Sequence, residues 1–109
     1  MPREIFVEFS EDANIDYKEL QKRALTEREG GKENSFNMQL LKAINREIQN
    51  LKIDPQHGIH IPRNYISKKL IERYGTDRLW KIDLVGYWRL LYTITGDDVK
   101  VIAFILEFM

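Results

Sequence analysis

The fold is decided by one stretch, Asp77-Arg-Leu-Trp-Lys-Ile-Asp-Leu-Val-Gly-Tyr-Trp-Arg-Leu-Leu-Tyr-Thr-Ile94. Aromatic and branched residues recur at every second position over 78–84 and again over 87–95, and Val85-Gly86 separates the two runs. A period of two places successive side chains on opposite faces of a strand. The stretch therefore predicts two antiparallel strands, Arg78–Leu84 and Tyr87–Thr95, joined by a tight connection.

A third strand is predicted directly after these two. Gly96-Asp97-Asp98 is a typical hairpin turn, and Val99–Phe108 is almost continuously apolar, as expected of a strand that is buried on both faces. Three consecutive strands of this kind form a meander.

The residues before the meander predict one strand and three helices. The expected elements are a strand at Ile5–Phe9, a helix capped by Ser10 or Asn14 that continues to about Arg28, a helix that begins at Asn34 or Ser35 and ends before Asp54-Pro55, and a short helix between Pro62 and Gly75. This order predicts a single α+β domain over residues 1–109. Its N-terminal strand and helices are expected to pack on one face of a small antiparallel sheet that ends in the three-strand meander.

The composition excludes several classes of protein. The chain has 109 residues and no cysteine, which removes disulfide scaffolds, cysteine-rich zinc modules and thiol catalysis. No apolar run approaches the roughly 20 residues that cross a bilayer, and Met1 to Ser10 lacks the basic start and apolar core of a signal peptide. We therefore expect a cytoplasmic protein with no membrane partner.

The net charge of zero hides an uneven distribution. Residues 1–34 carry 6 basic and 9 acidic side chains, whereas residues 41–89 carry 10 basic and 5 acidic ones. Such asymmetry is typical of a surface that faces a nucleic acid or an acidic partner. The alternative is that each helix has an ordinary solvated charged face.

The stretch quoted above resembles the core signature of the RelE/ParE toxin superfamily. The matching pieces are Leu79-Trp-Lys-Ile-Asp-Leu84, then Gly86-Tyr87, then Arg89-Leu-Leu-Tyr92. Upstream, Asp54-Pro-Gln-His-Gly58 is similar to a Pro-x-x-Gly stretch that is common before the first of these strands, and the Ile-Pro-containing insert that follows it is similar to the archaeal branch. The resemblance covers most of the chain.

The resemblance implies the toxin of a type II toxin–antitoxin system, with a four-stranded antiparallel sheet and a cognate antitoxin as partner. RelE-type members cut mRNA in the ribosomal A site, and ParE-type members inhibit DNA gyrase. We expect a RelE-like, ribosome-dependent mRNA endoribonuclease that inhibits translation without a cofactor or a metal. The alternatives are a non-catalytic or ParE-like toxin fold that acts by binding a protein, and a plain RNA-binding module.

The resemblance also assigns two catalytic residues. Lys81 falls on a basic position that binds and activates the scissile phosphate, and Arg89 falls on a strand arginine that stabilises its developing charge. The second lysine of the signature is Asp83 here, and the family's C-terminal tail, with a further Arg and Tyr, would begin where this chain ends. The residues themselves leave an alternative open, in which Asp83 simply forms ion pairs with Lys81 or Arg89 on a solvated face.

Other residues are candidates for binding RNA. Trp80, Trp88 and Tyr92 are expected in the core. His57 and His60 are expected in a loop, where His60 is a candidate proton carrier. Two histidines alone do not form a metal site. The side chains predicted to contact RNA are Arg78, Lys68, Lys69, Arg73 and Tyr87. The basic ones among them could equally face an acidic antitoxin or water.

The C-terminal strand suggests a place where a partner binds. Residues 104–109 are apolar and are expected to leave an exposed strand edge, with Phe104 and Phe108 as the partner-binding residues. The expected occupant is the antitoxin or, in a homodimer, a second copy of the chain.

Overall fold

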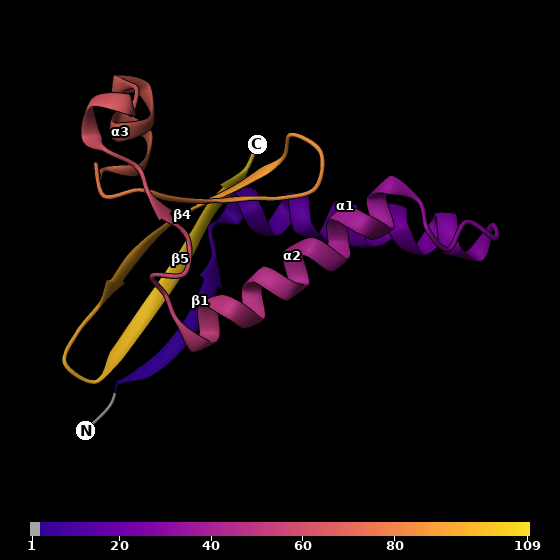
Figure 1. The fold of residues 1–109 in the computed structure, drawn as a ribbon, viewed down its shortest axis with the longest axis horizontal. Helices are drawn as coiled ribbons and strands as arrows, with labels where there is room; N and C mark the ends of the chain where they lie inside the picture. Colours follow the sequence, from indigo (N-terminus) through magenta and orange to yellow (C-terminus); the bar gives the residue numbers. More distant parts are fainter. Residues whose placement is uncertain (1–2) are drawn as a thin grey trace.

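The computed structural model describes residues 3–109 and has the predicted α+β architecture (Figure 1). In chain order, its elements are β1 (Glu4–Phe9), α1 (Glu11–Glu29), α2 (Phe36–Ile53), β2 (Ile59–His60), the 3-10 helix η1 (Arg63–Tyr65), α3 (Lys68–Tyr74), β3 (Trp80–Asp83), β4 (Arg89–Gly96) and β5 (Lys100–Phe108). The predicted three-strand meander is confirmed as β3, β4 and β5. No helix within residues 3–109 is both long and apolar enough to cross a membrane.

The five strands form one sheet in the order β1-β5-β4-β3-β2. The sheet is mixed rather than antiparallel throughout, because β1 pairs in parallel with β5, from Glu4 opposite Lys100 to Phe9 opposite Ile105. Strand β5 therefore has a neighbour on each side over Lys100–Ile105, and β4 alone beside residues 106–108.

The prediction of an open strand edge near the C-terminus is therefore wrong for Phe104, which pairs with Glu8 of β1 and with Thr93 of β4. Phe104 and Phe108 are partly buried and pack against two hydrophobic clusters of the domain itself. Docking of an antitoxin or of a second copy through a strand edge at Phe104 loses its structural basis, whereas a partner at Phe108 stays a prediction.

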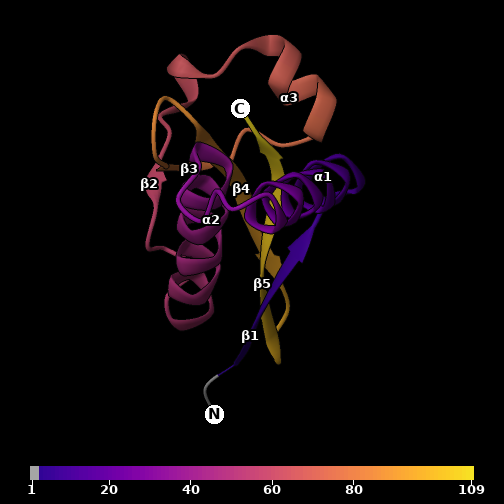
Figure 2. The same ribbon diagram turned by 90° about the vertical axis from the view of Figure 1, so that its right-hand side faces the viewer.

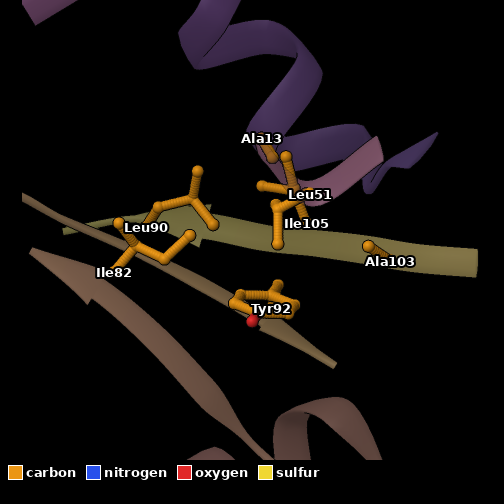
Figure 3. Close-up of a cluster of buried hydrophobic side chains, with 7 residues drawn as sticks. All are labelled: Ala13, Leu51, Ile82, Leu90, Tyr92, Ala103 and Ile105. Carbon is orange, nitrogen blue, oxygen red and sulfur yellow. The ribbon is translucent and has the colours of Figure 1, made fainter. Parts of the chain in front are cut away.

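The helices lie on both faces of the sheet. Helices α1 and α2 cover one face (Figures 1 and 2), as predicted, and residues from them complete a buried cluster with three strands (Figure 3). Helix α3 lies on the opposite face, where its residues Leu70, Ile71 and Tyr74 pack against a second cluster that includes Leu79 and Leu91. The members of the first cluster are Ala13, Leu51, Ile82, Leu90, Tyr92, Ala103 and Ile105.

Serine side chains start the three α-helices. The hydroxyls of Ser10 and Ser35 accept hydrogen bonds from the amides of Ala13 and Met38, which confirms both predicted caps. The short helix predicted between Pro62 and Gly75 is instead divided into η1 and α3, because the backbone is extended between them and Ser67 caps a new helix.

A β-bulge in β5 sets the directions of its last side chains. Leu91 of β4 lies opposite Glu107 and Tyr92 lies opposite Ile105, so Leu106 is an extra residue in the ladder. The bulge places Phe108 on the face covered by α1 and α2. The Ser10 hydroxyl donates to the carbonyl oxygen of Leu106, with 2.5 Å between the oxygens.

Candidate functional site

Lys81 and Arg89 come together at one end of the meander. Asp83 of β3 lies opposite Arg89 of β4, and Lys81 lies two residues before Asp83 on the same face of β3. The Lys81 Nζ is 3.2 Å from Asp83 Oδ1, and the Arg89 Nε is 3.8 Å from the same oxygen. The structure thus brings both predicted catalytic residues to a single carboxylate, as in the ion-pair alternative.

Two adjoining hollows share these two cations. The first, which we call the polar hollow, has a volume of about 320 Å³ and is lined by Lys81, Asp83, Gly86, Tyr87, Trp88 and Arg89. The second, which we call the apolar hollow, has a volume of about 380 Å³, and Lys81 and Arg89 are its charged lining residues. Its remaining lining residues are Ile59, His60, Ile61, Pro62, Tyr65, Leu70, Leu91 and Met109.

This arrangement suits a ligand that combines an anion with a flat, partly apolar group. Two converging cations can donate hydrogen bonds to phosphate oxygens. Tyr65 and Tyr87, with 78% and 99% of their surfaces exposed, offer aromatic faces beside these cations. Single-stranded RNA combines both chemical features.

Tyr92 holds the loop that brings β2 to the site. The Tyr92 hydroxyl donates to the carbonyl oxygen of Pro55 at 2.8 Å and accepts from the amide of Gly58 at 3.0 Å. Burial raises the pKa of Tyr92 to about 12. A Cβ on Gly58 would lie 2.7 Å from both the Tyr92 hydroxyl and the carbonyl oxygen of Lys81, so this close approach requires glycine.

A second tie joins the same loop to α2. His57 Nε2 lies 2.9 Å from Glu47 Oε2, and Asn50 Nδ2 donates to that oxygen at 3.3 Å. The carboxyl group of Glu47 is buried, and the charged group of Arg46 is 3.5 Å from its other oxygen. This contact is not predicted from the sequence, although the position of Glu47 between Ile44 and Leu51 on the apolar stripe of α2 is a signal for it.

The predicted RNA-binding residues are only partly gathered here. Tyr87 lies with Lys81 and Arg89 in the polar hollow, whereas Arg78 lines a different hollow. Lys68 and Lys69 are exposed on α3 and line neither the polar nor the apolar hollow.

Arg73 has contacts within the domain. Its guanidinium lies 3.1 Å from Asp12 of α1 and 3.8 Å from Glu107 of β5. The hydrogen bond to Asp12 is the main cause that raises the pKa of Arg73. Arg73 therefore joins α3 to α1 and to the bulge in β5.

The predicted aromatic residues divide between core and surface. The partly buried Trp80 stacks on the buried Tyr92, with 6.1 Å between their ring centres, and His60 lies edge-on to Trp80. Trp88 was expected in the core but is 41% exposed, because it precedes β4 in the connection between the strands. Within residues 3–109, no three His, Cys, Asp or Glu side chains are grouped so that they could hold a metal ion.

Comparison with known proteins identifies the fold. No family model matches the sequence, and no curated protein does. A YoeB/ParE toxin from Agrobacterium tumefaciens has a similar solved structure, with a TM-score of 0.58, 14% sequence identity and coverage of 94% of each chain. The chain therefore has a RelE/ParE-like fold, and this likeness carries no information about an archaeal branch.

Proposed function

We propose that this chain is the toxin of a type II toxin–antitoxin system and that it cleaves mRNA on the ribosome in the manner of RelE. One observation carries the proposal. Lys81 and Arg89 converge beside two hollows on a domain whose fold is similar to that of a YoeB/ParE toxin. Because its targets are the ribosome and the bound mRNA, the protein acts in the cytoplasm. A cognate antitoxin inhibits it.

The two cations supply the electrostatic part of the chemistry. Cleavage by the 2′-hydroxyl requires that this group lose a proton and that the phosphate accept charge. Lys81, with 29% of its side chain exposed, binds the phosphate, and the more exposed Arg89 stabilises the charge that develops on it. Neither role needs a cofactor or a metal.

We assign the proton transfer to His60, which lines the apolar hollow. His60 lines this hollow with Lys81 and Arg89, and imidazole is the side chain that most readily exchanges a proton near neutral pH. Its edge-on contact with Trp80, at 5.1 Å between ring centres, orients the ring. His60 is therefore the candidate general acid or base.

Asp83 favours a second candidate function. Its carboxylate occupies the position between the two cations that a phosphate needs, so an RNA ligand must displace it. A toxin of this fold that binds a protein, as a ParE-like inhibitor would, has no such requirement. In that case the apolar hollow, with the exposed Tyr65, is the surface that recognises the protein partner.

Induced expression followed by mapping of mRNA ends distinguishes mRNA cleavage from the protein-binding function. The chain, a Lys81→Ala/Arg89→Ala variant and an Arg28→Ala/Lys52→Ala control are each expressed at matched levels. We expect growth arrest with new mRNA 5′ ends for the chain and for the control, and neither effect for the first variant. Growth arrest without new ends, or an arrest that the first variant retains, contradicts cleavage and supports the protein-binding function.

A further inference from the structure

A third hollow lies on the other side of β2. It has a volume of about 430 Å³, and its lining residues are Gln56, His60, Arg63, Asp77, Arg78, Trp80 and Ile94. We propose that this β2 hollow binds a flanking nucleotide of single-stranded RNA, so that the strand crosses β2 from the site at Lys81 and Arg89. The inference rests on the proposed function because it takes RNA as the ligand.

Two arginines give the β2 hollow its charge. Arg78 is exposed, and its backbone is fixed on both sides, since its amide donates to Thr76 Oγ1 and its carbonyl oxygen accepts from Thr93 Oγ1. The charged group of Arg63 lies 3.2 Å from Asp77, yet 78% of its side chain remains exposed. Two guanidinium groups against one carboxylate leave a positive lining that suits a phosphate.

The rest of the lining suits a base. Trp80 is half-buried and is in contact with Tyr92 and His60, with ring centres 6.1 and 5.1 Å away. A fixed indole provides a surface on which a base can stack. Gln56 and His60 add polar groups that can hydrogen-bond to base edges. An acidic peptide would also use the arginines and the polar groups, but a base gains in addition a stacking contact with the indole, so RNA is the better fit.

His60 makes the β2 hollow continuous with the site. It lines both the β2 hollow and the apolar hollow, and it pairs with Trp80 across β2 and β3 while Ile59 pairs with Lys81. Strand β2, which has two residues, lies between the two hollows, and its His60 lines both of them. A nucleic acid strand held by Lys81 and Arg89 at one phosphate can thus present its neighbouring nucleotide to Arg78.

The test is the binding of a fluorescein-labelled uridine dodecamer by the full chain, measured by anisotropy at several salt concentrations. An Arg78→Ala variant is compared with an Arg28→Ala control, which removes an exposed arginine near the end of α1. Each phosphate contact to a single strand contributes a slope of about 0.7 in log affinity against log salt. We expect Arg78→Ala to lower the slope by about 0.7 and the affinity at 0.1 M salt by about fivefold, with no change for Arg28→Ala.

A second measurement reports on position rather than on charge. In a Trp88→Phe variant, Trp80 is the remaining tryptophan, so quenching of its fluorescence by the dodecamer places RNA at the β2 hollow. Equal binding by Arg78→Ala and Arg28→Ala, or no quenching of Trp80, overturns the inference. The inference is also overturned if the wild-type chain binds no RNA. It is likewise overturned if Arg78→Ala weakens the binding of a labelled glutamate dodecamer, an acidic peptide, as much as it weakens the binding of the uridine dodecamer.

The outcomes separate this inference from the proposed function. If new mRNA ends form but Arg78→Ala binds RNA as Arg28→Ala does, the inference that the β2 hollow binds RNA is overturned and mRNA cleavage stands. Arrest without new ends together with the expected binding results would overturn mRNA cleavage and leave the β2 hollow as an RNA-binding site.

Discussion

Asp83 accepts a hydrogen bond from the ammonium group of Lys81, with 3.2 Å between Oδ1 and Nζ. The carboxylate lies where a phosphate would have to bind, since the Arg89 Nε is 3.8 Å from the same oxygen. Asp83 thus competes with any anionic ligand for both cations. The strength of this competition is small, because the Asp83 side chain is 60% exposed and water screens the charges.

Replacing this carboxylate with an amide should strengthen the binding of RNA. The Asp83→Asn change removes a negative charge between two cations, and an exposed ion pair is worth about 0.2–1 kcal/mol, so the affinity should rise by up to about fivefold. The measurement is anisotropy with a labelled uridine dodecamer at low salt. Asp98→Asn, in the exposed turn before β5, is the matched control and should have little effect. Unchanged or weaker binding by Asp83→Asn would show that the carboxylate does not compete.

The Tyr92 hydroxyl should matter for stability. Tyr92→Phe leaves the amide of Gly58 and the carbonyl oxygen of Pro55 without their partner inside the domain, which costs about 1–3 kcal/mol in the free energy of unfolding. Urea denaturation measures this loss. Tyr87→Phe removes a hydroxyl from a residue that is 99% exposed and should be neutral. Equal stabilities for the two variants would refute the role of the hydroxyl.

Gly58 should not tolerate a methyl group. A Cβ there lies 2.7 Å from the carbonyl oxygen of Lys81, so Gly58→Ala must move β2 away from β3 and should cost about 1–3 kcal/mol. Gly30→Ala is the control, because its Cβ would meet its nearest atoms at 3.5 and 3.6 Å. Thermal unfolding measures both changes, and hydrogen exchange of the β2 and β3 amides locates the first. Unchanged exchange in Gly58→Ala would contradict the displacement.

Asp97 should make stability depend on pH. Its carboxylate accepts hydrogen bonds from the amides of Val99 and Lys100, chiefly the first, and these bonds lower its pKa in the folded state. A lowered pKa stabilises the fold at neutral pH, and this contribution is lost as the pH falls through the folded-state pKa. The free energy of unfolding of Asp97→Asn should therefore be lower than that of the wild type at neutral pH, and the gap should close as the pH falls through and below the ordinary carboxyl range. A gap that is constant with pH, or one that Asp98→Asn shares, would count against this account.

The sequence predicts the local structure well because each signal is local. The period of two over 78–84 and 87–95 predicts β3 and β4, and Ser10 and Ser35 mark two helix starts that the structure confirms. The parallel pairing of β1 with β5 has no such signal, since it depends on how α1 and α2 carry the chain across the sheet. Strand β2 was missed because two residues are too short to show a period.

The candidate site could be predicted only in part, because sequence patterns report on local structure and not on contacts between distant residues. Lys81, Asp83 and Arg89 lie on neighbouring strands of a hairpin, so their proximity follows from the pairing of β3 with β4. His60 reaches the site through contacts that are distant in sequence, above all the hydrogen bonds of Tyr92 to the loop before β2. The sequence predicts an RNA contact for Arg73, because nothing local reveals that this residue lies beside Asp12 and Glu107.

The most direct test of the central claim is cleavage of a defined mRNA by the purified chain on ribosomes whose A site is empty. Primer extension locates the ends that form, and removal of groups that stabilise charge in a transition state typically lowers a rate by about 100-fold or more. We predict cleavage within the A-site codon by the wild type and by Arg28→Ala/Lys52→Ala, and its loss in Lys81→Ala/Arg89→Ala. Intact mRNA with the wild type, or equal cleavage by the Lys81→Ala/Arg89→Ala variant, would contradict the account.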